Sequence, residues 1–259
     1  TMQLEWRLGR LARAAGEDAA ALDAYRRAVA HVEAIRIDMP VRYVDGRSSF
    51  RETLEPLYLG LTDLLLRRAA QVPAAEQPGL LYQARETVEL IKQTELQDYL
   101  RDRCSVESAR NDRRERPPAG TAVYYPVILP DRLVLLVETA GGMTRHEVAA
   151  TAEQVRRTAL AFVAALRSRG DHRAAGDELY RWLIAPIEPV LAAQGVSTLV
   201  AVPDGVLRLV PLAALHDGTD YLVRRLVLPT VPGLSLLGAA TTPGAAPGAA
   251  DRERRPPLL

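Results

Sequence analysis

The sequence predicts an α/β protein in which an N-terminal α-helical region precedes a sheet flanked by further helices. Residues 1–110 carry apolar side chains at the three- and four-residue spacing of amphipathic helices. From Thr121 onward, β-branched and aliphatic runs alternate with helical patterns, which is typical of an α/β domain. The segment between them, residues 111–120 (NDRRERPPAG), is charged and proline-rich, so we interpret it as a linker.

The first helical pair has the spacing of a packed antiparallel hairpin. Gly9, Ala21 and Ala28 are small enough to let two backbones approach, and Tyr25 would fill the gap between them. With Leu8, these residues resemble the pattern of one tetratricopeptide unit over about 30 residues. The aromatic positions of that pattern in its first helix are not matched.

A second helical pair follows, with a turn predicted at residues 72–79. Its apolar positions are Phe50, Leu54, Leu57, Leu61, Leu64 and Leu65, then Leu81, Ala84, Val88 and Ile91. A helical repeat cannot bury its own apolar face. We therefore expect either further repeats upstream, which the first residue Thr1 makes plausible, or docking of this pair onto the following domain.

The sheet region begins with a predicted hairpin. Strand-like runs at residues 122–129 and 133–139 are joined by residues 130–132, a spacing that indicates a short turn. Gly141-Gly142 then breaks the pattern, and apolar residues from Val148 to Leu166 predict a helix.

A second helix is predicted around Leu179, interrupted at Pro186 and ending by Gly195. Residues 197–202 are apolar on both faces, like a strand buried between helices. The turn at residues 203–205 (PDG) leads into short strand-like runs at residues 207–210 and 222–228. Residues 239–257 are too poor in apolar side chains to pack.

Composition narrows the function classes. A net charge of +1 provides no overall field to attract nucleic acid or an anionic membrane. The single cysteine, Cys104, excludes internal disulfides and cysteine-rich metal sites. No apolar run approaches the roughly 18 residues of a membrane span and no leader opens the chain, so we predict a cytoplasmic protein. Lys92 is the only lysine among 33 basic residues, and we attribute this scarcity of lysine relative to arginine to codon bias.

Cys104 is the obvious candidate nucleophile. A thiolate needs a base or a positive environment. Arg101 and Arg103 would favour it, but Asp102 opposes them and no histidine is near in the sequence. We interpret Cys104 as an inert structural thiol.

The histidines do not form a site in the sequence. Residues 216–218 (HDG) have the composition of a turn. His146 and His172 each adjoin an acidic residue but lack further ligands at metal-binding spacing, and His31 is predicted at the surface.

Other motifs are also incomplete. Ser235 lies in GLSLLG, which has one residue too many for a nucleophile elbow. No glycine-rich phosphate loop is present, and the basic residues 110–116 lack aromatic residues for stacking on bases. We therefore predict no catalytic, cofactor-binding or metal-ligating residue in this chain, and no cofactor.

Two segments resemble CHAT-domain proteins. Residues 92–104 (KQTELQDYLRDRC) resemble the segment that joins tetratricopeptide repeats to bacterial CHAT domains. Residues 202–217 (VPDGVLRLVPLAALHD), then Tyr221-Leu222 and residues 232–237 (PGLSLL), resemble the middle of a CHAT domain. The resemblance covers about residues 80–238, and its Pro-Asp-Gly block is the most specific part.

This resemblance implies a caspase-like sheet and a cysteine peptidase with a His–Cys dyad. The family carries its histidine in an Ala-Thr-His-Gly type segment and its cysteine in a Leu-Ser-Ala-Cys-Glu type segment, both beyond the resembling region. Neither His216 nor Cys104 occupies a matching position. We expect residues 121–238 to be the N-terminal part of the CHAT domain, and residues 239–259 a tail leading into a missing strand.

Three hypotheses follow. In the first, the chain is the N-terminal portion of a caspase-like cysteine endopeptidase whose helical repeats recruit a protein or peptide, and it is inactive alone. In the second, it is a non-catalytic adaptor that binds its partner through the helical region. In the third, Cys104 is a hydrolase nucleophile. None of the three involves nucleic acid or a membrane.

Overall fold

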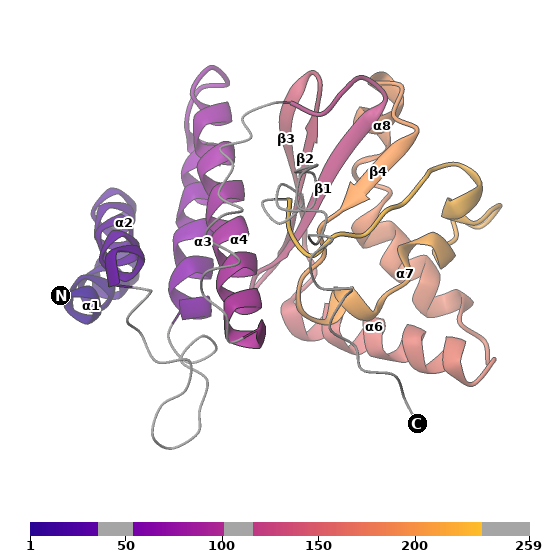
Figure 1. Cartoon of the computed structure of the whole chain (residues 1–259), viewed down its shortest axis with the longest axis horizontal. Helices are drawn as coiled ribbons and strands as arrows, with labels where there is room; N and C mark the ends of the chain where they lie inside the picture. Colours follow the sequence, from indigo (N-terminus) through magenta and orange to yellow (C-terminus); the bar gives the residue numbers. More distant parts are fainter. Residues whose placement is uncertain (36–53, 101–115, 235–259) are drawn as a thin grey trace, which may run out of the picture.

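The computed structural model describes residues 1–35, 54–100 and 116–234, and it confirms the α/β class. Figure 1 shows the N-terminal helices on one side of a sheet and a second group of helices on the other side. The sheet has the strand order β3-β2-β1-β4. β1 is antiparallel to β2, β2 is antiparallel to β3, and β4 runs parallel to β1.

The N-terminal helices are α1 (Met2–Ala14), α2 (Asp18–Ile35), α3 (Glu55–Gln71) and α4 (Gln77–Leu100). They form two hairpins, and α2 also packs on α3. The α3–α4 hairpin lies between the α1–α2 pair and the sheet (Figure 1).

Close packing of the first three helices depends on Tyr25. Its ring lies between Gly9 of α1 and Gly60 of α3, and a Cβ atom at Gly9 would lie 2.6 Å from Tyr25 Cδ2. Ala21 and Ala28 of α2 are fully buried. The predicted close approach at these small residues is confirmed, while the assignment to the tetratricopeptide family stays a prediction.

The strands are β1 (Thr121–Ile128), β2 (Leu133–Thr139), β3 (Gly142–Val148) and β4 (Thr198–Ala201). The predicted hairpin is confirmed, with Ile128 opposite Leu133 across the turn. β3 was not predicted, because Ala140-Gly141 forms a tight turn and Gly142 begins a further strand where the sequence indicated a break. The helix predicted from Val148 begins at Ala152 instead.

The helices of the other layer are α6 (Ala152–Arg167), α7 (Arg173–Leu183) and α8 (Glu188–Ala193). α6 opens with a capping box, in which the Thr151 side chain accepts from the Gln154 N–H and the Gln154 side chain accepts from the Thr151 N–H. α7 and α8 are separated near Pro186, as predicted. β4 follows at the predicted place, but only Leu199 and Ala201 are buried, while Thr198 and Val200 are half-buried.

The sheet divides its side chains between two cores by strand alternation. Val123, Tyr125 and Val127 join the core of the N-terminal helices, whereas Ala122 and Tyr124 join the core of α6, α7 and α8. Helices therefore cover both faces of the sheet, and the sheet contributes side chains to the core on each side. The predicted domain boundary within residues 111–120 stays a prediction.

The segment after β4 differs from the sequence prediction. Three 3₁₀ turns follow it: η3 (Gly205–Leu209), η4 (Leu212–Ala214) and η5 (Leu222–Arg224). The predicted strand at residues 207–210 is therefore wrong, because Asp204 caps a 3₁₀ turn at Gly205. The run predicted at residues 222–228 begins as a 3₁₀ turn. Only from Val227 does the chain run parallel to β4.

In residues 1–35, 54–100 and 116–234, no helix is both long and apolar enough to cross a membrane.

Candidate functional site

The strongest candidate site lies at the carboxyl end of β4. Ligands of open α/β sheets bind outside the carboxyl ends of the parallel strands. Here β4 and the parallel strand β1 are joined one residue past β4 by the Val202 N–H, which donates to the Tyr124 carbonyl at 2.8 Å. The chain then turns through Pro203, Asp204 and Gly205.

A buried ion pair ties this turn to the helical region. Lys92 of α4 has a side chain that is 0% exposed, and its Nζ lies 2.7 Å from Asp204 Oδ1. The same Nζ donates to the Pro203 carbonyl at 2.9 Å. Arg208 of η3 contacts Asp204 at 3.1 Å and also pairs with Glu95 of α4. We call Lys92, Glu95, Asp204 and Arg208 the Lys92 cluster.

The turn itself is built by Asp204. Its Oδ1 accepts from the Gly205 N–H at 2.8 Å, which caps the first turn of η3. Gly205 has φ +49°, a conformation that glycine adopts without strain. The Pro-Asp-Gly sequence therefore supplies both the turn and the carboxylate that receives Lys92.

Burial and charge act in opposite directions in this pair. Burial lowers the pKa of Lys92, and the Asp204 carboxylate opposes that shift. Burial would raise the pKa of Asp204, but Lys92, Arg208 and the Gly205 N–H together lower it. Asp204 is therefore ionised at neutral pH. It holds the ammonium group as an ion pair rather than accepting its proton.

A second polar group lies around Tyr180 of α7. Its hydroxyl donates to Glu188 at 2.5 Å and accepts from Arg225 at 2.7 Å. Burial and the bond to Glu188 raise the pKa of Tyr180 to about 12, so it remains a neutral hydrogen-bond donor at pH 7. Arg225 also lies 3.2 Å from Asp217. This group links α7 and α8 to the turn after η4.

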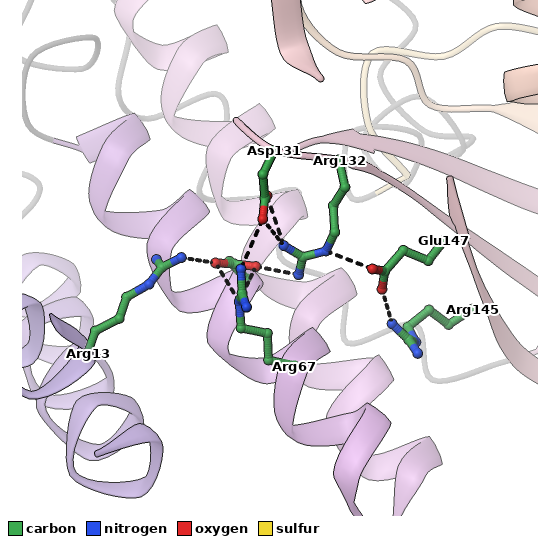
Figure 2. A network of polar contacts seen from close by, with 7 residues as sticks. Arg13, Arg67, Asp131, Arg132, Arg145 and Glu147 are labelled. Carbon is green, nitrogen blue, oxygen red and sulfur yellow. Dashed lines mark hydrogen bonds and ion pairs between the residues drawn. The ribbon is translucent and has the colours of Figure 1, made fainter. Parts of the chain in front are cut away.

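A third polar group, shown in Figure 2, joins α1 and α3 to the β1–β2 turn. The buried Asp63 of α3 pairs with Arg13 of α1, with Arg67 at 3.2 Å and with Arg132 at 2.5 Å. Asp131 lies 3.1 Å from Arg67 and 2.9 Å from Arg132. The carboxylate of Asp63 therefore contacts three guanidinium groups.

The same network continues to β3. Glu147 lies 3.4 Å from Arg132 Nε and 2.7 Å from Arg145. Each of the four guanidinium groups drawn in Figure 2 contacts a carboxylate. The network therefore braces the helical region against the sheet.

The histidines have local contacts only. His31 is exposed, as predicted. The half-buried His146 lies 3.2 Å from Thr144 Oγ1, and burial lowers its pKa, so it is neutral at pH 7. His172 contacts the ring of Phe162.

The predicted turn at His216 is confirmed. His216 Nδ1 accepts from the Gly218 N–H at 2.8 Å. The Asp217 carboxylate accepts from the N–H groups of Thr219 and Asp220. His216 and Asp217 therefore form a turn rather than an acid–base pair.

Cys104 and Ser235, the two candidate nucleophiles, lie outside the described residues. No group of three or more histidine, cysteine, aspartate or glutamate side chains in residues 1–35, 54–100 and 116–234 could hold a metal ion.

The role of Lys92 was not predicted from the sequence. A signal was present, because Lys92 is the single lysine among 33 basic residues. The buried ion pair with the Asp204 carboxylate gives a structural reason for an amine at position 92.

Comparison with known protein families matches the C-terminal part of the chain. No curated protein matches the chain. The family model of the CHAT domain matches residues 173–252, which include α7, β4, the Pro-Asp-Gly turn and η3 to η5. Residues 173–252 are therefore similar to the CHAT domain, which is the extent of the match.

Proposed function

We propose that these residues belong to a CHAT-domain protein of the caspase-like cysteine endopeptidase family, in which the helical region recruits a partner or substrate. The observation that carries the proposal is the Lys92 cluster. It joins the two segments that resemble the family, since Lys92 begins one of them and Asp204 lies in the other. Lys92 and Pro203 are 111 residues apart in the sequence.

Catalysis in such a family needs a thiolate, an imidazole within hydrogen-bond reach and a donor for the oxyanion. The family's histidine and cysteine segments have no counterpart in this sequence. Residues 1–259 alone are therefore expected to cut no peptide bond. A longer polypeptide that includes both segments is expected to do so.

Two measurements test this proposal. Purified residues 1–259 are incubated with a fluorogenic peptide library, and the Cys104→Ala variant serves as the matched control. We expect no turnover from either protein. Thiol-dependent cleavage that disappears in Cys104→Ala would contradict the proposal and would support the Cys104 hydrolase instead.

The second measurement concerns the gene. Its reading frame beyond the codon for Leu259 is expected to encode a His-Gly segment and a Ser-Ala-Cys segment. The polypeptide containing both should cleave peptides and lose that activity when the cysteine of the second segment is replaced. A stop codon before either segment would end the peptidase hypothesis for this gene.

The adaptor remains the second candidate function, and one observation favours it. Leucines on the outer surface of α1 are exposed to solvent. An adaptor needs such a surface and does not need a nucleophile.

A further inference from the structure

The outer surface of α1 carries an exposed leucine ridge. Leu4, Leu8 and Leu11 are 57%, 46% and 68% exposed. Their spacing of four and three residues places them on one side of the helix. No described residue covers this ridge. Gly9 is the buried residue of α1, and the leucines of this helix are exposed instead of packed in the core.

Arginines border the leucine ridge on both sides. Arg7 and Arg10 are exposed and lie on one flank of it, on the basis of helical spacing. On the other flank, Arg27 of α2 is 56% exposed and pairs with Glu5 at 3.0 Å. Glu5, the only carboxylate of α1, is thereby engaged.

The remaining arginine of α1 points away from this surface. Arg13 reaches Asp63 of α3 in the network of Figure 2. The outer surface of α1 therefore combines an apolar ridge with basic flanks, and we call Leu4, Leu8, Leu11, Arg7 and Arg10 the α1 ridge.

We propose that the α1 ridge binds an acidic amphipathic helix of a partner protein. Amphipathic helices bind through apolar residues spaced three and four apart, and opposite charges at the flanks set their partner preference. Glutamate or aspartate beside the partner's apolar residues would lie opposite Arg7 and Arg10. This inference rests on the proposed recruiting role of the helical region and names the partner that it recruits.

The charges argue against a second copy of the chain as the occupant. If two α1 ridges packed together, Arg7 and Arg10 of one copy would lie near those of the other, and like charges at these positions are destabilising. A membrane is also a weaker fit. Surface-bound helices bury aromatic as well as aliphatic side chains, whereas Trp6, the only aromatic residue of α1, is partly buried against the helical core.

The test uses two fluorescent helical peptides of about three heptads. Both carry leucine at the seam positions, and they differ only in having glutamate or lysine at the flanking positions. We expect residues 1–259 to bind the glutamate peptide at least tenfold more tightly by fluorescence anisotropy. The affinity should fall as salt is raised, because exposed charges are screened.

Two variants locate the binding surface. Leu8→Glu should weaken binding of the glutamate peptide at least tenfold. Leu160→Glu is the matched control, because Leu160 is similarly exposed, at 40%, but lies on α6 in the opposite layer. Charge reversal by Arg7→Glu with Arg10→Glu should transfer the preference to the lysine peptide. Circular dichroism confirms that each variant is folded.

Several results would overturn the inference. Equal binding of the two peptides, or binding unchanged in Leu8→Glu, would remove the α1 ridge as the site. A dimer seen by light scattering and lost in Leu8→Glu would assign the ridge to a second copy. Binding to phosphatidylserine vesicles, lost in the same variant, would assign it to a membrane. Each of these results leaves the peptidase test unaffected, so the two proposals can fail separately.

Discussion

At the scale of single residues, the Lys92–Asp204 pair makes a stringent prediction. Asp204→Asn keeps the side-chain oxygen that caps η3 but removes the counter-charge of a fully buried ammonium. Breaking a buried ion pair by removing one partner costs about 3–5 kcal/mol. We expect the free energy of unfolding to fall by about 3 kcal/mol, the lower end of that range, because Asp204 is 22% exposed and water can partly compensate for the lost charge. Urea denaturation monitored by circular dichroism measures this free energy.

A double-mutant cycle distinguishes this explanation from general disruption of the turn. Lys92→Met with Asp204→Asn removes both charges, so the double variant should be more stable than Asp204→Asn alone. If the losses of the two single variants simply add, the ion pair is not the reason for the instability.

The same pair predicts a dependence on pH. Burial opposes ionisation of Asp204, but Lys92 and Arg208 lower its pKa in the folded protein below the value near 3.9 of an unfolded aspartate. The stabilisation is therefore present above about pH 4 and is lost as the pH falls through the lower, folded-state pKa. The stability difference between the wild type and Asp204→Asn should shrink as the pH falls below about 4. A difference that stays constant from pH 7 to pH 3 would contradict this account.

At the scale of helices and strands, Tyr25 fixes how closely α1, α2 and α3 approach. A methyl group at Gly60 would overlap Tyr25 Cε1, and the ring cannot shift easily because Gly9 closes its other side. Overpacking of this kind costs about 1–3 kcal/mol, which over most of that range is larger than the gain of about 1 kcal/mol in helix propensity. Gly60→Ala should therefore destabilise the protein in thermal denaturation.

Gly79→Ala is the control for this prediction. Gly79 lies in α4, and a Cβ atom there would meet nothing within 4 Å. This variant should be neutral, or stabilised by up to about 1 kcal/mol. A similar loss in both variants would show that helix geometry, rather than Tyr25, sets the cost.

The same scale shows why some elements could be predicted and others could not. The strands with continuous apolar runs, β1, β2 and β4, and the helices with a clear stripe were evident from periodicity. β3 was not, because it is an edge strand in which residues 144–147 (TRHE) are all polar and show no apolar alternation. The run at residues 207–210 is apolar enough for a strand, but Asp204 caps Gly205 and the run forms a 3₁₀ turn instead.

The candidate site was predictable to a smaller extent. The Pro-Asp-Gly turn could be recognised from residue chemistry alone, since proline and glycine restrict or permit specific backbone angles. Its partner Lys92 could not, because it lies on a helix more than 100 residues earlier in the chain. Ion pairs between distant elements depend on how those elements pack, and neither periodicity nor local spacing encodes that.

At the scale of the whole molecule, neighbouring residues of β1 bind opposite layers. The Tyr124 hydroxyl donates to the Leu183 carbonyl of α7 at 2.7 Å, and the Tyr125 hydroxyl donates to Glu89 of α4 at the same distance. Burial raises the pKa of both tyrosines well above the ordinary value, so both hydroxyls keep their protons. One strand thus connects the N-terminal helices to the layer of α6, α7 and α8.

This connection predicts that both layers unfold together. The two tryptophans can report on them separately, because Trp6 lies in α1 and Trp182 in α7. In the Trp182→Phe variant, tryptophan fluorescence comes from Trp6 and reports on the N-terminal helices. In the Trp6→Phe variant, it comes from Trp182 and reports on the layer of α6, α7 and α8. We expect the two fluorescence transitions in urea to coincide with each other and with circular dichroism, as in a two-state protein.

Phenylalanine variants of the two tyrosines extend this test across the sheet. Each loses one buried hydrogen bond, at a cost of about 1–2 kcal/mol. If the layers form one cooperative unit, Tyr124→Phe should shift the Trp6 transition as much as the Trp182 transition, and Tyr125→Phe should do the same. If instead each variant shifts only the reporter in its own layer, the helical region is an independent domain. The boundary predicted at residues 111–120 would then also be a thermodynamic one, and the Lys92 cluster would join two units that can separate.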